Sequence, residues 1–142
     1  MLVPFQDNQK TFFAQYDNLA DIATFIHSYC QEANLDNSSC YHVETAVDEA
    51  CSNIIEHAYG GEGKGKIDIC CHVNAQGITI TLTDRGASFN PDNIPEPDLT
   101  APLQERESHG LGLYFIHKLM DEVIYSHDAD NSNILTMVKY KK

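Results

Sequence analysis

Four polar residues recur at intervals of four in the middle of this sequence: Thr45, Glu49, Asn53 and His57. On a helix, residues four apart are neighbours on one face. The stripe combines a carboxylate, an amide and an imidazole with no Lys or Arg, whereas a solvated helix face usually carries long charged side chains. The residues alone leave both interpretations open, a solvated face and a functional stripe.

A functional stripe of this kind would have a definite chemistry. Asn53 offers a neutral amide oxygen, which suits a hard cation such as Mg²⁺, and the other ligands would be phosphate oxygens and water. Glu49, one turn earlier, could accept a proton from an attacking hydroxyl or water.

The apolar residues around the stripe predict the helix that positions it. Val43, Ala46, Val47, Ala50, Ile54 and Ala58 fall three or four apart and form a buried face. We expect a helix from about Tyr41 to Tyr59, ended by Gly60–Gly61. The preceding Leu35–Cys40 is expected to be a polar turn.

Asp84 closes the stretch ITITLTD, whose β-branched residues indicate a strand. Asp-Arg-Gly is ordinary turn chemistry, so Asp84 fits a turn residue. It also fits a carboxylate that accepts a hydrogen bond from a ligand amine, with Gly86 letting that ligand approach the backbone. Both interpretations stay open here.

Gly110 and Gly112 open another helical stretch, GLGLYFIHKLMDEV. Glycines at a helix start leave N–H groups exposed at the positive end of the helix dipole, which favours an anion; a packing role is the alternative. The segment before them, about 87–109, holds four prolines and has no clear periodicity. We expect it to be a functional lid.

The remaining stretches predict the rest of a compact fold. QKTFFAQY fits a short edge strand, Asn18 or Asp21 can cap a first helix, and IDICCHV is a strand that ends in a turn at Gln76–Gly77. VIYSHD and NILTMVKY form a hairpin. The fold class is therefore α+β: a two-layer sandwich with a mixed, mostly antiparallel sheet and helices on one face.

Composition narrows the class of function. At 142 residues we expect one domain, residues 1–142. The formal net charge of −12 lacks the footprint of a nucleic-acid binder. No apolar run reaches the length of a membrane span, and the first residues lack the pattern of a secretory signal. The five cysteines lack CxxC spacing, and Cys51, Cys70 and Cys71 fit small core residues, so we expect a cytoplasmic protein without membrane contact.

The segments VETAVDEACSNIIEHAY, TDRGASFNP and HGLGLYFIHKLMDEV, followed by ILTMVK, resemble in their order the Bergerat-fold (GHKL) ATP-binding superfamily. Within it they look most like the anti-sigma-factor serine/threonine kinases of bacteria. The resemblance runs from the second helix to the end of the chain. Ser88 departs from the usual motif Asp-x-Gly-x-Gly, because it stands at the second glycine.

The resemblance implies a role for each matching residue. Asn53 would ligate Mg²⁺ between the phosphates of ATP, and Glu49 would be the general base. Asp84 would read the adenine amino group beside Gly86. The backbone of Gly110, Leu111 and Gly112 would cradle the phosphates, and the hydroxyl of Thr136 would help to hold adenine.

The implied function is transfer of the γ-phosphoryl group of ATP to a serine or threonine of a partner protein. The implied partners are a small anti-sigma-factor antagonist, which is phosphorylated, and a sigma factor; homodimers are common in the family, which would make a second copy another partner. One alternative is a non-catalytic ATP-binding regulator that switches partner binding. A detached histidine-kinase domain would need a phosphoacceptor helical hairpin, and an ATP-driven clamp would need a further transducer domain.

Overall fold

The computed structural model describes residues 8–88 and 108–142, with the backbone alone for 108–112. Its principal elements are β1 (Gln9–Phe13), α1 (Leu19–Glu32), α2 (Asn37–Asn53), a π-helical turn (Ile54–Ala58, the π turn), β2 (Lys66–Asn74), β3 (Gly77–Asp84), α3 (Ser108–Leu119), β4 (Glu122–His127) and β5 (Asn133–Tyr140). Among the described residues, no helix has both the length and the apolar character needed to cross a bilayer.

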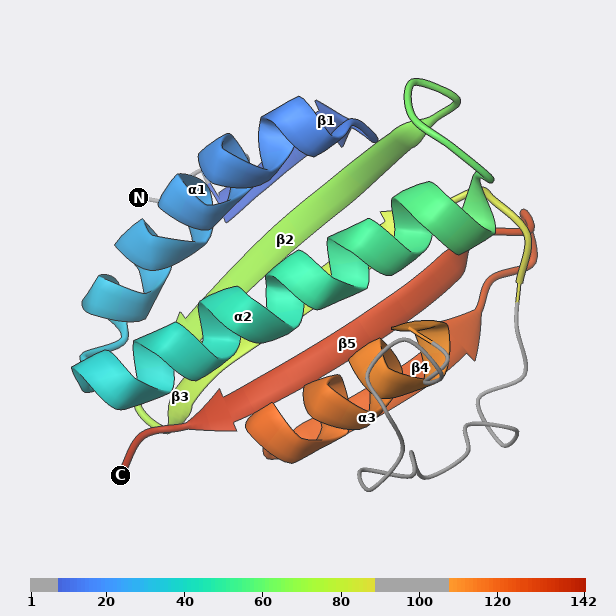
Figure 1. Ribbon diagram of the computed structural model, residues 1–142. Coiled ribbons are helices and arrows are strands. Elements are labelled where there is room, and N and C mark those ends of the chain that lie inside the picture. Colours follow the sequence, from blue (N-terminus) through green and yellow to red (C-terminus); the bar gives the residue numbers. More distant parts are fainter. Residues whose placement is uncertain (1–7, 89–107) are drawn as a thin grey trace.

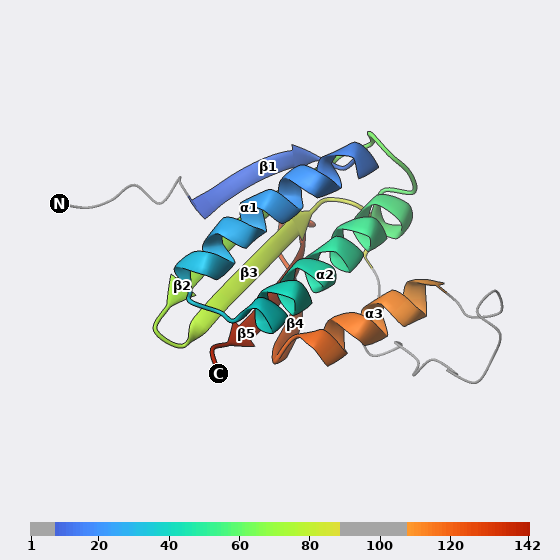
Figure 2. The ribbon, with the colours of Figure 1, turned by 60° about the vertical axis from the view of Figure 1, so that its left-hand side comes forward.

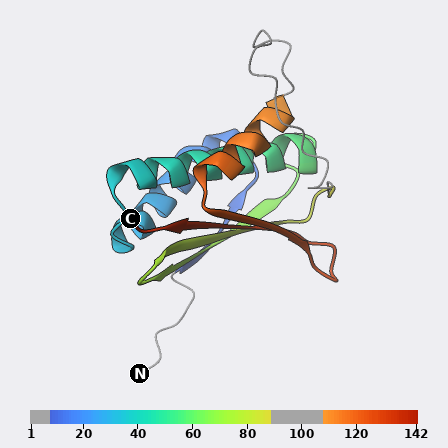
Figure 3. The same ribbon diagram turned by 90° about the horizontal axis from the view of Figure 1, so that it is seen from below.

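The five strands form one sheet in the order β1-β2-β3-β5-β4. Every neighbouring pair is antiparallel, so the sheet is not mixed as predicted. The three helices cover one face of the sheet and leave the other open (Figures 1 and 3). The predicted two-layer α+β class is confirmed, including the edge strand at β1 and the closing hairpin.

Strand and helix periodicities meet in the core between the two layers. Along β3, Ile78, Ile80 and Leu82 are buried and alternate with half-buried threonines, as expected for a strand with one covered face. On α1, Ile22 and Ile26 lie one turn apart and are both buried. Each such side chain contributes about 1.5–3 kcal/mol when it leaves water.

Helix α2 lies between α1 and α3 over the middle of the sheet (Figure 2). It begins at Asn37, not near Tyr41, so the prediction of a polar turn over Leu35–Cys40 is wrong. The cause is a helix cap: Asp36 has an extended backbone, and its Oδ1 accepts a hydrogen bond from the backbone N–H of Ser39 at 2.7 Å. The polar residues after Asp36, which resemble a loop in the sequence, therefore form the first turn of α2.

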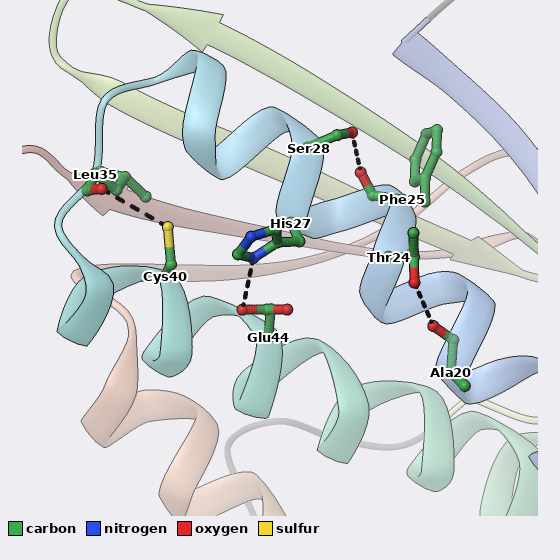
Figure 4. A network of polar contacts seen from close by, with 8 residues as sticks. All are labelled: Ala20, Thr24, Phe25, His27, Ser28, Leu35, Cys40 and Glu44. Atoms are coloured by element: carbon green, nitrogen blue, oxygen red, sulfur yellow. Dashed lines mark hydrogen bonds and ion pairs between the residues drawn. The ribbon is translucent and has the colours of Figure 1, made fainter.

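Figure 4 shows the contacts where α1 meets α2. His27 Nδ1 lies 3.3 Å from Glu44 Oε2, and the Cys40 thiol contacts the carbonyl oxygen of Leu35 at 3.8 Å. Asn18 stands at the N-cap of α1, but its side chain does not cap the helix and instead donates to the carbonyl of Phe13. Beside these polar contacts, the buried side chains of α1, which are Ile22, Ile26 and Cys30, belong to the core.

The cysteines follow the prediction with one exception. Cys51 and Cys71 are buried, whereas Cys70 is half-buried and faces the open side of the sheet opposite Thr81. Burial raises the pKa of the Cys51 thiol to about 12. A thiol held protonated in this way is a poor nucleophile, which fits a packing role.

The C-terminal end of the α2 region is not α-helical. The N–H of Tyr59 donates to the carbonyl of Ile54 at 2.9 Å, a spacing of five residues, so the predicted helix to Tyr59 ends in the π turn. Gly60 and Gly61 then adopt positive φ values of 74° and 146° and end the segment, as predicted. Turns of this type often occur at functional sites.

Candidate functional site

A pocket of about 390 Å³ lies where the end of α2 and the π turn face α3 and the ends of β3, β4 and β5. This volume is in the range of small-molecule sites. The described residues that line it are Ala50, Asn53, Ile54, His57, Ala58, Asp84, Ala87, Ser88, Leu113, Ile116, Tyr125, Ser126, His127, Asn133, Ile134 and Leu135. None of these is Lys or Arg, so an anion here would have to be neutralised by other means.

Asn53 lies in the pocket wall at the last residue of α2. Its Nδ2 atom is buried and has no hydrogen-bond partner among the described residues. A buried polar atom without a partner is costly, unless a ligand completes its interactions. The two amide atoms of an asparagine can exchange places by a flip, so either atom can face that ligand.

Glu49 lies one turn before Asn53 on the same helix and is half-buried. It is not among the described residues that line the pocket. Burial raises the pKa of its carboxyl group, and the neighbouring Asp48 and Glu56 raise it further. A carboxylate with a raised pKa is a stronger base than an ordinary glutamate.

Asp84 ends β3 at the pocket and is only 6% exposed. One of its oxygens, Oδ1, accepts two hydrogen bonds, from the backbone N–H of Gly86 and from Nδ2 of Asn133, each at 2.9 Å. The first bond is the Asx turn expected of Asp-Arg-Gly, and burial at the pocket is what the ligand interpretation requires. The two interpretations of Asp84 are therefore compatible.

Gly86 is explained by a contact that the sequence did not reveal. A Cβ atom at this position would lie 2.4 Å from both the carbonyl carbon and the oxygen of Ala58 in the π turn. The adjacent N–H of Ala87 donates to that same oxygen at 2.7 Å. The glycine therefore lets the end of the helix approach the backbone, whereas the predicted approach was that of a ligand.

Tyr59 adds a second link between these segments. Its hydroxyl donates to the carbonyl of Lys66 at 2.6 Å and accepts from the N–H of Arg85 at 3.0 Å. Together with the Gly86–Ala58 contact, this fixes the turn after Asp84 against the segment that follows Asn53.

Gly110, Leu111 and Gly112 lie inside α3, which begins at Ser108. The first four N–H groups of a helix have no partner within it, so those of Gly110 and Leu111 belong to this set. Leu113, on the next turn, lines the pocket. The predicted phosphate-binding segment is thus at the N-terminal end of a helix that borders the pocket. The predicted lid lies outside the described residues except for its ends.

The structure does not bring Thr136 to the pocket. Thr136 pairs with Thr81 on β3, and both face the open side of the sheet, whereas Asp84 and its partner Asn133 face the helices. The residue that stands beside Asp84 is therefore Asn133, three positions earlier.

Asn133, His127 and Tyr125 line the pocket and were missed by the sequence analysis. Asn133 is the first residue of the predicted strand NILTMVKY, and the other two lie in the predicted strand VIYSHD, so all three looked like ordinary strand residues. The alternation of β4 and β5 could have placed them on one face, had the register with β3 been known. Burial raises the pKa of the Tyr125 hydroxyl to about 12, so this wall residue stays neutral.

Sequence comparison identifies relatives of the chain. A family model described as a histidine kinase-like ATPase domain matches residues 12–139. The serine-protein kinases RsbW of Bacillus thuringiensis (strain Al Hakam) and Bacillus cereus (strain 03BB102) are each 34% identical over 98 residues, with 66% of this chain covered. The match spans 61% of the length of each relative.

Solved structures agree on the fold. The RsbU and RsbW domains of a Mycobacterium tuberculosis protein match with a TM-score of 0.63 at 17% identity, over 94% of this chain and 33% of that one. The histidine kinase domain of a blue-light activated kinase from Erythrobacter litoralis EL346 gives a TM-score of 0.52 at 15% identity, over 85% and 58% of the two chains. With the family match over most of its length, this chain belongs to the histidine kinase-like ATPase domain family.

Proposed function

We propose that the chain is an ATP-dependent protein serine/threonine kinase that acts as a bacterial anti-sigma regulatory factor and phosphorylates a small antagonist protein. The observation that carries the proposal is the pair formed by Asp84 and Asn53 at one pocket. Asp84 is a buried carboxylate with one oxygen already saturated, and Asn53 has a buried amide atom without a partner among the described residues. Names of the relatives, serine-protein kinases, support the kinase class.

Different pocket residues would bind different parts of ATP. Oδ2 of Asp84 is left to accept a hydrogen bond from the adenine amino group, and the apolar wall includes Leu113, Ile116 and Leu135. The N-terminal N–H groups of α3 would face the phosphates, where the helix dipole favours negative charge. Asn53 would hold Mg²⁺, which supplies the charge neutralisation that the lining residues lack.

Glu49 supplies the general base in this proposal. The hydroxyl oxygen of the partner's serine attacks the γ-phosphorus, the bond from that phosphorus to the β–γ bridging oxygen breaks, and the hydroxyl proton passes to the Glu49 carboxylate. Positioning provides most of the rate. Because the pKa of Glu49 is raised, transfer should fall on acidification at a higher pH than for an ordinary glutamate.

Transfer of label from γ-labelled ATP to candidate antagonists encoded beside this gene tests the proposal, together with ATP titrations with and without Mg²⁺. We expect Glu49→Gln to keep ATP binding and lose transfer, and Asn53→Ala to lose the Mg²⁺-dependent part of binding. Glu44→Gln is the matched control, because Glu44 is also half-buried on α2 but pairs with His27 on α1.

Each outcome assigns a function. Tight ATP binding by the wild type without any transfer would favour the non-catalytic regulator. The position of Glu49 outside the described pocket lining is an observation that favours this second candidate. Wild-type transfer in both the Glu49 and the Asn53 variants would overturn the site. The same assays against a sigma factor address the second partner, and sedimentation with and without ATP addresses the homodimer.

A further inference from the structure

Asn133 sits at the centre of a hydrogen-bonded row that crosses three strands. In the sheet register it lies opposite Asp84 on β3 and opposite His127 on β4. Its side chain contacts both neighbours, so β4, β5 and β3 each contribute one polar group to the same edge of the pocket.

The contacts fix which way the Asn133 amide points. One amide atom lies 2.9 Å from Oδ1 of Asp84 and 3.0 Å from the carbonyl oxygen of Gly86. Both of these are acceptors, so this atom must be the nitrogen. The other amide atom is then Oδ1, an acceptor, and it lies 3.2 Å from Nδ1 of His127. His127 must therefore carry a hydrogen on Nδ1.

The row leaves Asp84 with one oxygen, Oδ2, that has no hydrogen-bond partner among the described residues. Oδ1 accepts from the N–H of Gly86 and from Asn133, and Asp84 is only 6% exposed. Oδ2 is the atom left to meet a ligand, and it can only accept. A ligand with a hydrogen-bond donor opposite Oδ2 is therefore favoured, and a ligand with a carbonyl oxygen in that position is repelled.

We propose that Asn133, held by His127, is a positioning residue that sets the selectivity of this pocket for a 6-amino purine over a 6-oxo purine. This inference rests on the proposed nucleotide binding and extends it to a residue outside the motifs of the sequence. Asn133 acts through Asp84: its amide holds Oδ1 and leaves Oδ2 for the ligand. Without the amide, the N–H of Gly86 is the remaining described donor that orients the carboxylate, so the bond from Oδ2 to a ligand donor is less well aligned and the preference for a donor weakens.

Binding of two nucleotides that differ in one group tests this. Adenosine diphosphate carries the 6-amino group, and inosine diphosphate carries an oxygen in its place. Kd values for both, measured by calorimetry, would be compared for the wild type, Asn133→Ala and Asn133→Ser. Thr81→Ala is the control, because it removes a polar side chain from the open face of the same sheet. Thermal unfolding shows whether each variant folds.

We expect Asn133→Ala to weaken binding of adenosine diphosphate about tenfold, the order expected for a hydrogen bond to a charged group. Binding of inosine diphosphate should change less than about twofold, so the ratio of the two Kd values moves toward one. Asn133→Ser, which keeps a donor, should lie between. A residue that only stabilises the fold would weaken both nucleotides equally.

Two further measurements isolate the row itself. In an Asp84→Ala background, Asn133→Ala should have no additional effect on the ratio, because the amide acts only through that carboxylate. His127→Ala should lower the ratio of the Kd for inosine diphosphate to the Kd for adenosine diphosphate, by a smaller factor than Asn133→Ala does. His127→Asn, whose amide nitrogen can replace Nδ1 as the donor, should restore the ratio.

The outcomes separate this inference from the function on which it rests. If the wild type binds neither nucleotide, the proposed function fails and the inference fails with it. If the wild type prefers adenosine diphosphate and Asn133→Ala and Asn133→Ser keep that preference in full, the inference alone is overturned. Equal effects of Asn133→Ala in the presence and absence of Asp84 would also overturn it.

Discussion

The two sides of the helical layer are built by different physical means. Where α1 and the first turns of α2 cover β1 and β2, the space between the layers is filled by aliphatic side chains and thiols, and Ile26, Val43 and Ile67 have no exposed surface. Where the π turn and α3 face β3, β5 and β4, the space is a pocket, with Asp84 and the Asn53 amide at its wall. We call these the packed side and the pocket side.

The difference indicates which side contributes most to stability and which side is available for ligand binding. A filled space gains free energy from every buried methylene group, whereas a pocket forgoes that gain and buries polar groups that a ligand must satisfy. Substitutions on the two sides should therefore separate the free energy of unfolding from nucleotide binding.

On the packed side, Ile67→Ala should lower the free energy of unfolding by about 2–5 kcal/mol, because it leaves a cavity where the side chain is fully buried. Denaturant titration measures the change. The Kd of adenosine diphosphate for the folded variant should stay within about twofold of wild type. A large loss of affinity at full folding would show that the two sides are not independent.

Beside the pocket, Gly86→Ala should cost about 1–3 kcal/mol of the free energy of unfolding, because the new Cβ would meet the backbone of Ala58 in the π turn at 2.4 Å. Since the obstacle is backbone, adding Ala58→Gly should give little rescue in the same denaturant titration. Full rescue by Ala58→Gly would mean that the side chain of Ala58 and not its carbonyl group sets the contact.

On the pocket side, Asn53→Ala should change the free energy of unfolding by less than about 1 kcal/mol in either direction, while Mg²⁺-dependent nucleotide binding is lost. Deleting the amide removes some packing but also removes a buried polar atom without a described partner. Calorimetric unfolding without ligand measures the first effect. A loss as large as that of Ile67→Ala would contradict the distinction between the sides.

The elements that could be predicted well from the sequence are those whose apolar residues recur at a regular spacing. The alternation in ITITLTD and the three-and-four spacing of Val43, Ala46 and Val47 predicted the presence and type of β3 and α2, though not the ends of α2, because burial of one face imposes those periods. Boundaries set by single side chains were less visible: Asp36 caps α2 with a hydrogen bond that no spacing announces.

The site was predictable where one element carries it and not where strands combine. Asp84 and Asn53 lie at the ends of single elements, and both are at the pocket. Thr136 and Asn133 depend on how β5 pairs with β3, and an odd offset along a strand moves a side chain to the opposite face. A short motif does not contain that register. The π turn is equally hidden, because one shifted hydrogen bond leaves the apolar pattern intact.

The contact between Gly86 and Ala58 has a consequence for how such sequences evolve. Selection for glycine at position 86 comes from the approach of the helix end, which exists with or without a ligand. A chain with this fold that bound no ligand would still need that glycine, whereas Asp84 would keep only its turn bond to the N–H of Gly86 and its bond to Asn133. The glycine is therefore required by the packing of the backbone alone, and its presence in a related sequence would indicate this fold without indicating a bound ligand.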